Sequence, residues 1–121
     1  MKAVFDTNIL IDYLNGIEQA RREFEQYRIL QISIITFIEV MVGVQNSDEE
    51  NVVRGFLDSF QILDLSEEIG RETIHLRRKH KLKIPDAIVY ATARSQGGML
   101  VTRNTKDFKP EWVDIRVPYS L

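Results

Sequence analysis

The sequence predicts an α/β protein, with a central parallel sheet of four to five strands and helices on both faces. Two observations predict this class. Short and almost wholly apolar segments, such as residues 2–5 and 99–102, alternate along the chain with longer segments of helical period. Strands this apolar are typical of parallel sheets, because both faces of such a sheet are buried. At 121 residues the chain has the length of an ordinary domain, and we expect one domain over residues 1–121.

The first half of the chain begins with the predicted strand 2–5, which leads directly into a short helix over residues 7–14. Residues 17–28 carry apolar side chains at the spacing of an amphipathic helix. The elements that follow are a strand over 30–33, a buried helix over 36–43, a helix over 47–60 and a strand over 61–65. Strands and helices therefore alternate through this half.

The second half continues this alternation. A long helix is predicted over residues 66–81, and its last turns are basic, as the helix dipole favours. Residues 84–98 form the next predicted helix, with Pro85 in its first turn. A strand over 99–102, a turn or short helix over 104–108 and a last strand over 113–117 complete the chain. In such folds the strand-to-helix turns gather at the carboxyl edge of the sheet, where ligands bind.

Composition limits the class of protein further. The chain is 44% hydrophobic and 28% charged, as in globular proteins. It has no cysteine, which excludes disulfides and thiolate metal sites and fits the reducing cytoplasm, where we expect this protein. Its longest apolar stretch, residues 32–44, is too short to span a bilayer, so no membrane partner is expected. The net charge of −2 does not indicate a nucleic-acid binder, unless bound metal ions reverse the sign of an acidic site.

Three acidic residues lie in apolar surroundings: Asp6 in VFDTNILI, Glu39 in IITFIEVMV and Asp86 in KIPDAIVYA. Each lies at or near the start of a predicted helix. Burial of an unpaired carboxylate costs several kcal/mol, so each of these residues needs either local hydrogen bonds or a bound cation.

Each acid alone has a purely structural interpretation. Asp6 could be the N-cap of the following helix, and Asp86 could complement the dipole of its own helix. The segment from Thr36 to Glu39 matches a capping box, S/T-x-x-E. None of these interpretations requires a ligand.

The three acids together favour a metal site. Helix starts at one edge of a parallel sheet converge, so their carboxyl groups would raise one another's pKa unless a cation lay between them. Carboxylate oxygens suit Mg²⁺ or Mn²⁺, and the chain offers only two histidines and no cysteine as softer ligands. Such sites are suited to phosphodiester hydrolysis, because divalent ions activate water and stabilise the transition state.

Four segments, in this order, resemble the four motifs of the PIN-domain ribonucleases: VFDTNILIDYL, TFIEVMVG, KIPDAIVYATA and LVTRNTKDF. The similarity is greatest to the small VapC-type toxins of toxin–antitoxin pairs and extends from residue 4 to about residue 108. It implies a PIN-like three-layer α/β/α sandwich and an endoribonuclease that depends on Mg²⁺ or Mn²⁺. It also implies RNA as substrate, a cognate antitoxin as inhibitory partner, and a homodimer.

The resemblance assigns roles to individual residues. Asp6, Glu39 and Asp86 match the catalytic acids that hold the metal in that family. Thr7 and Asn8 match the polar residues that steady the first acid. We expect the most firmly bound ion at Asp6 and Asp86, with a second ion recruited together with the RNA phosphate.

The fourth motif departs from the family pattern. Thr102 matches the threonine that opens it, but relatives often have an aspartate where this chain has Asn104. Asp107 follows three residues later and is the predicted fourth catalytic and metal-binding acid, with Thr102 and Asn104 supporting the site. Asn104 and Asp107 also resemble a helix-capping pair.

Basic side chains near the predicted site are candidates for RNA contacts. Arg103 and Lys106 lie in the fourth motif, and Arg77 and Arg78 belong to the dense basic cluster of residues 77–83. For this cluster, a solvated helix end that complements the dipole is the favoured interpretation. Contacts to phosphates would make RNA affinity depend on salt and not on sequence.

Apolar side chains near the N-terminal helices are candidates for partner surfaces. VapC-like proteins bind their antitoxin in a hydrophobic groove in this region and usually dimerise. The candidates here are Ile11, Leu14, Phe24 and Phe56.

Two other interpretations are open. A catalytically silent PIN-like module would bind RNA or protein without cutting, and the loss of one acid would favour it, but Asp6, Glu39 and Asp86 are all present. An aspartate-nucleophile phosphatase would carry a second acid two residues after the first, where this chain has Asn8. The metal-dependent nuclease is the interpretation that the residues favour.

Overall fold

The computed structural model describes residues 2–121. Its elements are β1 (Lys2–Phe5), α1 (Thr7–Leu14), α2 (Glu18–Phe24), β2 (Ile29–Ser33), α3 (Ile34–Val42), α4 (Ser47–Leu57), β3 (Gln61–Leu63), α5 (Glu67–His80), α6 (Ile84–Ser95), β4 (Met99–Val101) and β5 (Ile115–Arg116). All the predicted strands and helices are present, and residues 104–108 form a turn. Within the described residues, none of the helices combines the length and the apolar character needed to span a bilayer.

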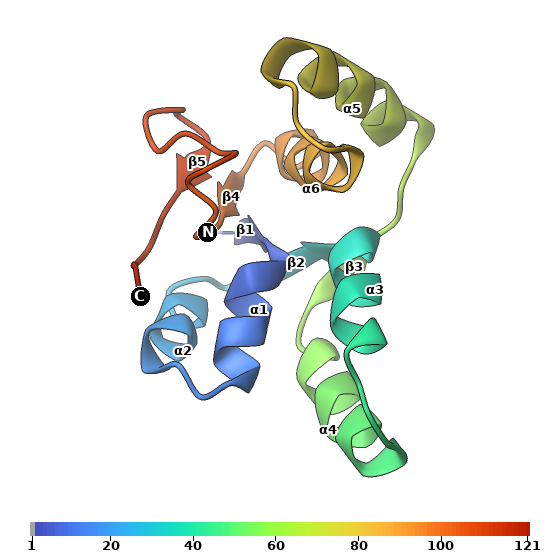
Figure 1. The fold of residues 1–121 in the computed structure, drawn as a ribbon, viewed down its shortest axis with the longest axis vertical. Coiled ribbons are helices and arrows are strands. Elements are labelled where there is room, and N and C mark those ends of the chain that lie inside the picture. The colour runs from blue at the N-terminus through green and yellow to red at the C-terminus, as the bar shows by residue number, and fades with distance from the viewer. Residues whose placement is uncertain (1) are drawn as a thin grey trace.

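The five strands form one parallel sheet in the order β3-β2-β1-β4-β5 (Figure 1). In the central strand β1, Val4 lies opposite Gln31 of β2 on one side and opposite Leu100 of β4 on the other. The predicted parallel sheet is confirmed. From β1 the chain adds β2 and then β3 on one side, and it then crosses over to add β4 and β5 on the other side. The topological switch point, where α/β sheets place their ligands, therefore lies between β1 and β4.

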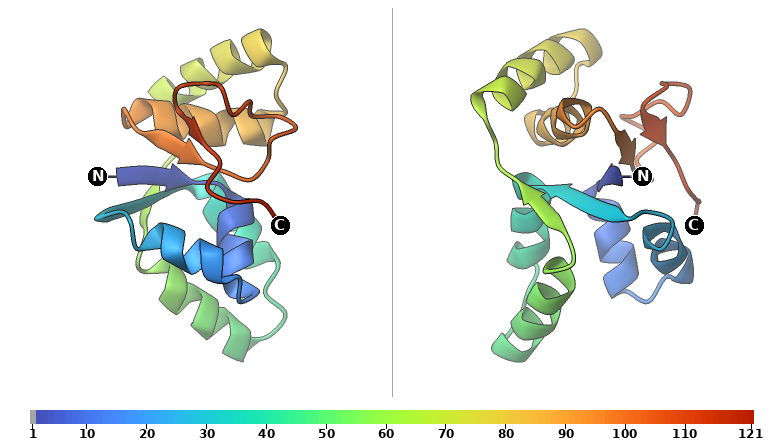
Figure 2. Two further views of the ribbon diagram at one scale, coloured as in Figure 1. Left: turned by 90° about the vertical axis from the view of Figure 1, so that its left-hand side faces the viewer. Right: turned by 180° about the vertical axis from the view of Figure 1, so that it is seen from behind.

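Helices cover both faces of this sheet. Successive side chains of a strand point to opposite faces. Ala3 and Phe5 accordingly pack in the core formed with α1, α2, α3 and α4, whereas Val4 packs in the core formed with α5 and α6. Figure 2 shows these two helical layers on either side of the sheet. The predicted α/β/α sandwich is confirmed.

Aromatic rings fill much of the core on the α1–α4 face. The Phe5 ring contacts Phe24 and Tyr27 edge to face, with centroids 4.9 and 5.3 Å apart, a favoured aromatic geometry. Helix α2 ends at Phe24, so the predicted helix over 17–28 is too long. The chain turns there, and the Tyr27 hydroxyl donates to Glu23 at 2.8 Å.

The topology places three strand ends beside one helix start. Asp6 directly follows β1, α3 directly follows β2, and Thr102 directly follows β4. Because parallel strands end at the same edge, these three points lie at the carboxyl edge of the sheet. Helix α6 leads into β4, so its N-terminal turn, which contains Asp86, lies at this edge too.

Candidate metal centre

Asp6 follows the central strand and caps helix α1. Its Oδ1 accepts a hydrogen bond from the Thr7 backbone N–H at 2.8 Å. Its Oδ2 accepts from the Thr102 hydroxyl at 2.8 Å and from the Asn8 side-chain amide at 3.2 Å. Only 6% of Asp6 is exposed. Asp6 therefore has the predicted capping role. Together, the Thr7 N–H, the Thr102 hydroxyl and the Asn8 amide hold its carboxylate in one orientation.

Asn8 and Thr102 join the ends of β1 and β4 around Asp6. The Asn8 side-chain amide donates to Thr102 Oγ1 at 3.2 Å, and its Oδ1 accepts from the Arg103 backbone N–H at 3.0 Å. Thr102 Oγ1 also accepts from the Asn104 backbone N–H at 3.0 Å. The structure thus brings Asn8, Thr102 and Asn104 together beside Asp6.

Glu39 lies on α3, and its hydrogen-bond partner is Thr7. The Thr7 hydroxyl donates to Glu39 Oε1 at 2.6 Å and lies 3.1 Å from the Thr36 hydroxyl. Helix α3 begins two residues earlier than predicted, because the Ser33 hydroxyl caps it by accepting from the Ile35 N–H at 3.1 Å. Thr36 therefore lies inside the helix, and the capping box predicted for Thr36 and Glu39 is wrong. Thr7 steadies Asp6 through its backbone and Glu39 through its side chain.

Asp86 lies in the first turn of α6 and is partly buried. Burial raises the pKa of Asp86 above that of an ordinary aspartate, and the charges of Asp107 and Glu39 raise it further. The charge of Lys83, the N-cap residue of α6, lowers it. Asp86 is therefore close enough to Asp107 and Glu39 for their charges to raise its pKa.

The pKa of Asp6 is shifted in the same direction. Burial raises the pKa of Asp6 to about 6, despite the hydrogen bonds from Thr102 and Thr7 that lower it. The charges of Asp86 and Glu39 add to the rise. Acids on α3 and α6 therefore disfavour ionisation of the carboxylate that follows β1, as expected where carboxylates converge without a cation.

The fourth motif forms a small closed unit. The Asp107 backbone N–H donates to Asn104 Oδ1 at 3.2 Å, and the Asn104 side-chain amide donates to Asp107 Oδ2 at 3.0 Å. The hydrogen bonds of the predicted capping pair are thus present, but they close a turn, and no helix follows in the part of the chain that the structure describes. Asp107 is still close enough to Asp86 to raise its pKa. The side chains of Asn104 and Asp107 therefore belong to the same acidic edge as the other candidates.

The donor set fits a divalent cation in chemistry and charge. Among residues 2–121, no ion pair involves Asp6, Glu39, Asp86 or Asp107. In the same residues, no three His, Cys, Asp or Glu side chains lie close enough together to hold one ion. Mg²⁺ is commonly bound through one or two carboxylates and several waters, so a pair of these acids suffices.

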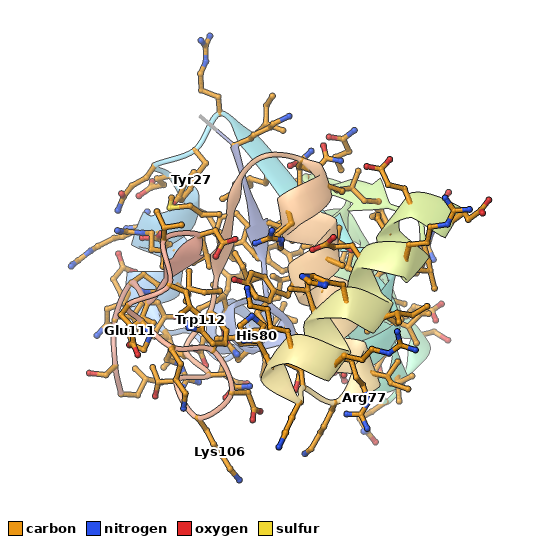
Figure 3. All side chains as sticks on the ribbon, turned by 90° about the horizontal axis from the view of Figure 1, so that it is seen from above. Tyr27, Arg77, His80, Lys106, Glu111 and Trp112 are labelled. Atoms are coloured by element: carbon orange, nitrogen blue, oxygen red, sulfur yellow. The ribbon has the colours of Figure 1, made fainter. Side chains whose placement is uncertain are left out.

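The predicted RNA-binding residues differ in how free their charges are. Arg103 is 29% exposed in its side chain, and its Nε and Nη2 donate to the Asp12 carboxylate at 2.7 and 2.8 Å. Its guanidinium is therefore occupied. Lys106 extends away from the body of the protein, and Arg77 lies at the end of α5 (Figure 3). Arg78, beside Arg77, is also exposed.

Two residues that sequence reasoning missed are Asp12 and Tyr119. Asp12 lies on α1, and the Tyr119 hydroxyl donates to its Oδ2 at 2.8 Å. The segment around Asp12, ILIDYL, is as apolar as the segments of the three predicted acids, and this signal could have found it. Tyr119 carries no comparable signal, because its partner is 107 residues away in the chain.

Two hollows lie away from the acids. A hydrophobic groove of about 270 Å³ opens between α1, α2 and α4, and Phe24 and Phe56, two of the predicted partner-surface residues, line it. The Phe56 ring stacks on Tyr13 in this groove, with centroids 4.4 Å apart. A larger hollow of about 820 Å³ beside α5 and α6 contains none of the candidate site residues. The acidic edge is thus not part of either hollow.

The chain belongs to the PIN domain family, whose profile matches residues 3–109. It is 32% identical over 113 residues to Ribonuclease VapC1 of Methanocaldococcus jannaschii, a match that covers 89% of this chain and 79% of that protein. It is 30% identical over 122 residues to the tRNA(fMet)-specific endonuclease VapC of Shigella flexneri, covering 90% and 91% of the two chains.

The fold is similar to that of a chain in a toxin–antitoxin complex from Klebsiella pneumoniae. The TM-score is 0.92 and the sequence identity 42%, and the match covers 98% of this chain and 99% of the other. The resemblance to PIN-domain proteins of the VapC type is thereby confirmed.

Proposed function

We propose that this chain is an endoribonuclease that depends on Mg²⁺ or Mn²⁺ and acts as the toxin of a toxin–antitoxin pair. One observation carries the proposal: Asp6 after β1, Glu39 on α3 and Asp86 on α6 form one acidic edge, where the charges of Asp86 and Glu39 raise the pKa of Asp6 and the charge of Glu39 raises the pKa of Asp86. RNA as the substrate is supported by the relatives, which are named as a ribonuclease and as a tRNA endonuclease.

The acidic residues have different roles in this site. Asp6 and Asp86 hold the ion, and Asp107 contributes a further negative charge at the same edge. Glu39 is fixed through Oε1 by Thr7 and keeps its other oxygen for water or for an ion. A bound Mg²⁺ or Mn²⁺ supplies an activated water and neutralises charge on the scissile phosphate.

Exposed cations guide the RNA backbone to this acidic edge. Arg77 and Arg78 lie in the last turn of α5, shortly before α6 begins in the chain, and Lys106 extends from the fourth motif. Their contacts are to phosphates, so RNA affinity falls with salt and changes little with sequence. Arg103 can contact a phosphate in the same way only when its guanidinium no longer pairs with Asp12.

The antitoxin occupies the groove between α1, α2 and α4. Phe24 and Phe56 line this groove, and apolar grooves are suited to the apolar face of a partner segment. A second copy of the chain packs against α3, where Ile38 and Val42 lie one turn apart and are 49% and 77% exposed. Ile11 and Leu14 extend the apolar surface on α1.

A catalytically silent PIN-like module is the alternative. It is favoured by the absence, within residues 2–121, of any three ligand-type side chains near enough to share one ion. Such a module would bind RNA or the antitoxin and would leave RNA intact.

Incubation of the purified chain with RNA distinguishes the two functions. The substrates are initiator tRNA, other tRNAs and unstructured RNA, each with Mg²⁺, with Mn²⁺ and with EDTA. The nuclease produces discrete fragments with either metal and none with EDTA. Binding of RNA without cleavage under all three conditions would support the silent module. Growth arrest on expression, relieved by the co-expressed antitoxin, tests the toxin role.

A further inference from the structure

Asp12 is the centre of a partly buried hydrogen-bond network that connects to the acidic edge through Asn8. It is 5% exposed, and it accepts from Arg103 Nε at 2.7 Å and from Arg103 Nη2 at 2.8 Å. The Tyr119 hydroxyl donates to the same carboxylate at 2.8 Å. The network therefore joins α1, the turn after β4 and the C-terminal segment.

This network continues to Asp6 through the backbone of Arg103. The Arg103 N–H donates to Asn8 Oδ1 at 3.0 Å, and the other end of the Asn8 amide donates to Asp6 Oδ2 at 3.2 Å. An asparagine side chain has an acceptor end and a donor end. The Arg103 N–H binds the acceptor end, so the donor end of Asn8 is directed at Asp6. Displacement of Arg103 would release this orientation.

Stability alone is a weak reason for this ion pair, in which Asp12 is buried and the Arg103 side chain is 29% exposed. Burial by itself would raise the pKa of Asp12, but the hydrogen bonds from Arg103 and Tyr119 and the charge of Arg103 hold it below its ordinary value. Desolvation offsets much of the attraction in a pair of this kind, and apolar residues often replace such pairs without loss of stability. What apolar residues cannot replace is the fixed direction of the bidentate contact.

We propose that Asp12 is a positioning residue of the metal site: by anchoring Arg103, with Tyr119 as a second donor, it directs Asn8 and Thr102 toward Asp6. This inference rests on the proposed function for its effect on cleavage, but its effect on the orientation of Asn8 is independent of that function. The partners that orient a metal ligand typically contribute about 10- to 100-fold in metal affinity or activity.

The chain contains a matched control. Glu23 is also buried, and it accepts from Arg116 Nε at 2.7 Å, from Arg116 Nη2 at 3.0 Å and from the Tyr27 hydroxyl at 2.8 Å. Within residues 2–121, none of the hydrogen bonds of the Glu23 carboxylate reaches Asn8, Thr102 or Asp6. Both arginines also bond through their backbone. The Arg116 carbonyl accepts from the Thr102 N–H at 3.0 Å, a backbone bond beside the paired strands β4 and β5, whereas the Arg103 N–H binds the Asn8 side chain itself. Glu23→Gln and Asp12→Asn therefore disrupt networks of the same kind, but only the second network orients a side chain that donates to Asp6.

The experiment compares wild type, Asp12→Asn, Tyr119→Phe and Glu23→Gln in four measurements. Mn²⁺ affinity is measured by calorimetry without RNA. Cleavage is measured as separate kcat and KM values. Exchange of the Asn8 side-chain amide protons is measured by NMR without metal or RNA. Thermal unfolding reports the stability of each variant.

Asp12→Asn is expected to weaken Mn²⁺ binding and to lower kcat by about 10- to 100-fold, with little change in KM. It is also expected to speed exchange of the Asn8 amide. Tyr119→Phe leaves Arg103 paired, so smaller changes in the same direction are expected. If Asp12→Asn does not fold, Tyr119→Phe carries the test. Glu23→Gln is expected to lose similar stability and to keep the Mn²⁺ affinity, kcat and Asn8 exchange of wild type.

Three results would overturn the inference. One is wild-type Mn²⁺ affinity and Asn8 exchange in Asp12→Asn. Another is an equal loss in Glu23→Gln, which would indicate general loosening. The third is tighter RNA binding with undiminished kcat in Asp12→Asn. That result would mean that Arg103 binds RNA phosphate once Asp12 no longer pairs with it. A wild type that cuts no RNA would contradict the proposed function, whereas NMR exchange would still decide the inference.

Discussion

Replacement of Asp6 by asparagine removes the carboxyl group whose pKa the fold raises to about 6, while keeping its size. In the metal-free protein, folded Asp6 keeps its proton up to about that pH, whereas the unfolded chain loses it near the ordinary value of 3.8. Between these two values the folded state binds more protons. The free energy of unfolding contributed by Asp6 therefore falls as the pH rises.

The magnitude follows from the two pKa values. Between a pH of about 4.5 and about 7.5, the Asp6 contribution to the free energy of unfolding decreases by about 2 kcal/mol. Asp12 and Glu23, whose pKa values are lowered, act in the opposite direction over the acidic range. The difference between wild type and Asp6→Asn cancels such shared contributions. Asp6→Asn should therefore gain about 2 kcal/mol relative to wild type across this interval.

Urea unfolding in EDTA at several pH values measures this difference. Asp58→Asn, which changes an exposed aspartate at the end of α4, should show no such gain and serves as the control. Addition of Mn²⁺ near neutral pH should then stabilise wild type and leave Asp6→Asn unchanged, because the ion binds the folded site. A difference between wild type and Asp6→Asn that stays constant within about 0.5 kcal/mol over the whole range would refute the reasoning.

Three further predictions concern single side chains. Thr7→Val removes the hydroxyl that holds Glu39, and cleavage measured in single turnovers should fall about tenfold while thermal unfolding changes little. Asp107→Asn should lower the cleavage rate less than Asp86→Asn, because Asp86 holds the ion and Asp107 only adds negative charge at the same edge. Equal losses in the two variants would show that Asp107 also binds the ion. Phe24→Ala removes a buried ring from the aromatic core and should lower the free energy of unfolding by about 3–5 kcal/mol in urea titrations.

The sequence contained the information for the sheet and for the acids, because both follow from burial. Strands covered on both faces are apolar throughout, and this pattern located β1 and β4 without knowledge of their partners. Asp6, Glu39 and Asp86 could be identified as site candidates because a carboxylate among apolar residues needs hydrogen bonds or a cation to offset the cost of its burial. Their convergence followed from topology, since parallel strands end at one edge.

The exact partners of the side chains could not be predicted in the same way. Ser33 and Thr36 are both good capping residues, and the choice depends on where β2 stops pairing with β3, at Ser33 and Leu63. Thr7 lies beside Asp6 in the chain but directs its hydroxyl to Glu39, which is 32 residues away. Local patterns do not encode such distant partners.

The same limit explains the expectation for Arg103. Its position in the fourth motif made it a candidate for RNA contact, and only the folded chain shows the carboxylate of Asp12, 91 residues away, against its guanidinium. Contact between Arg103 and RNA remains a prediction that now requires this pair to open.

The central claim is that carboxylates and a divalent ion cleave RNA at this edge, and comparison of wild type with Asp86→Asn tests it most directly. Both proteins, and Asp58→Asn as control, are given the same RNA with Mg²⁺ and with EDTA. We predict cleavage by wild type and by the control that requires Mg²⁺. We also predict a loss of about a hundredfold or more in Asp86→Asn, or about 2.7 kcal/mol of transition-state stabilisation. Equal cleavage by wild type and Asp86→Asn would contradict the account.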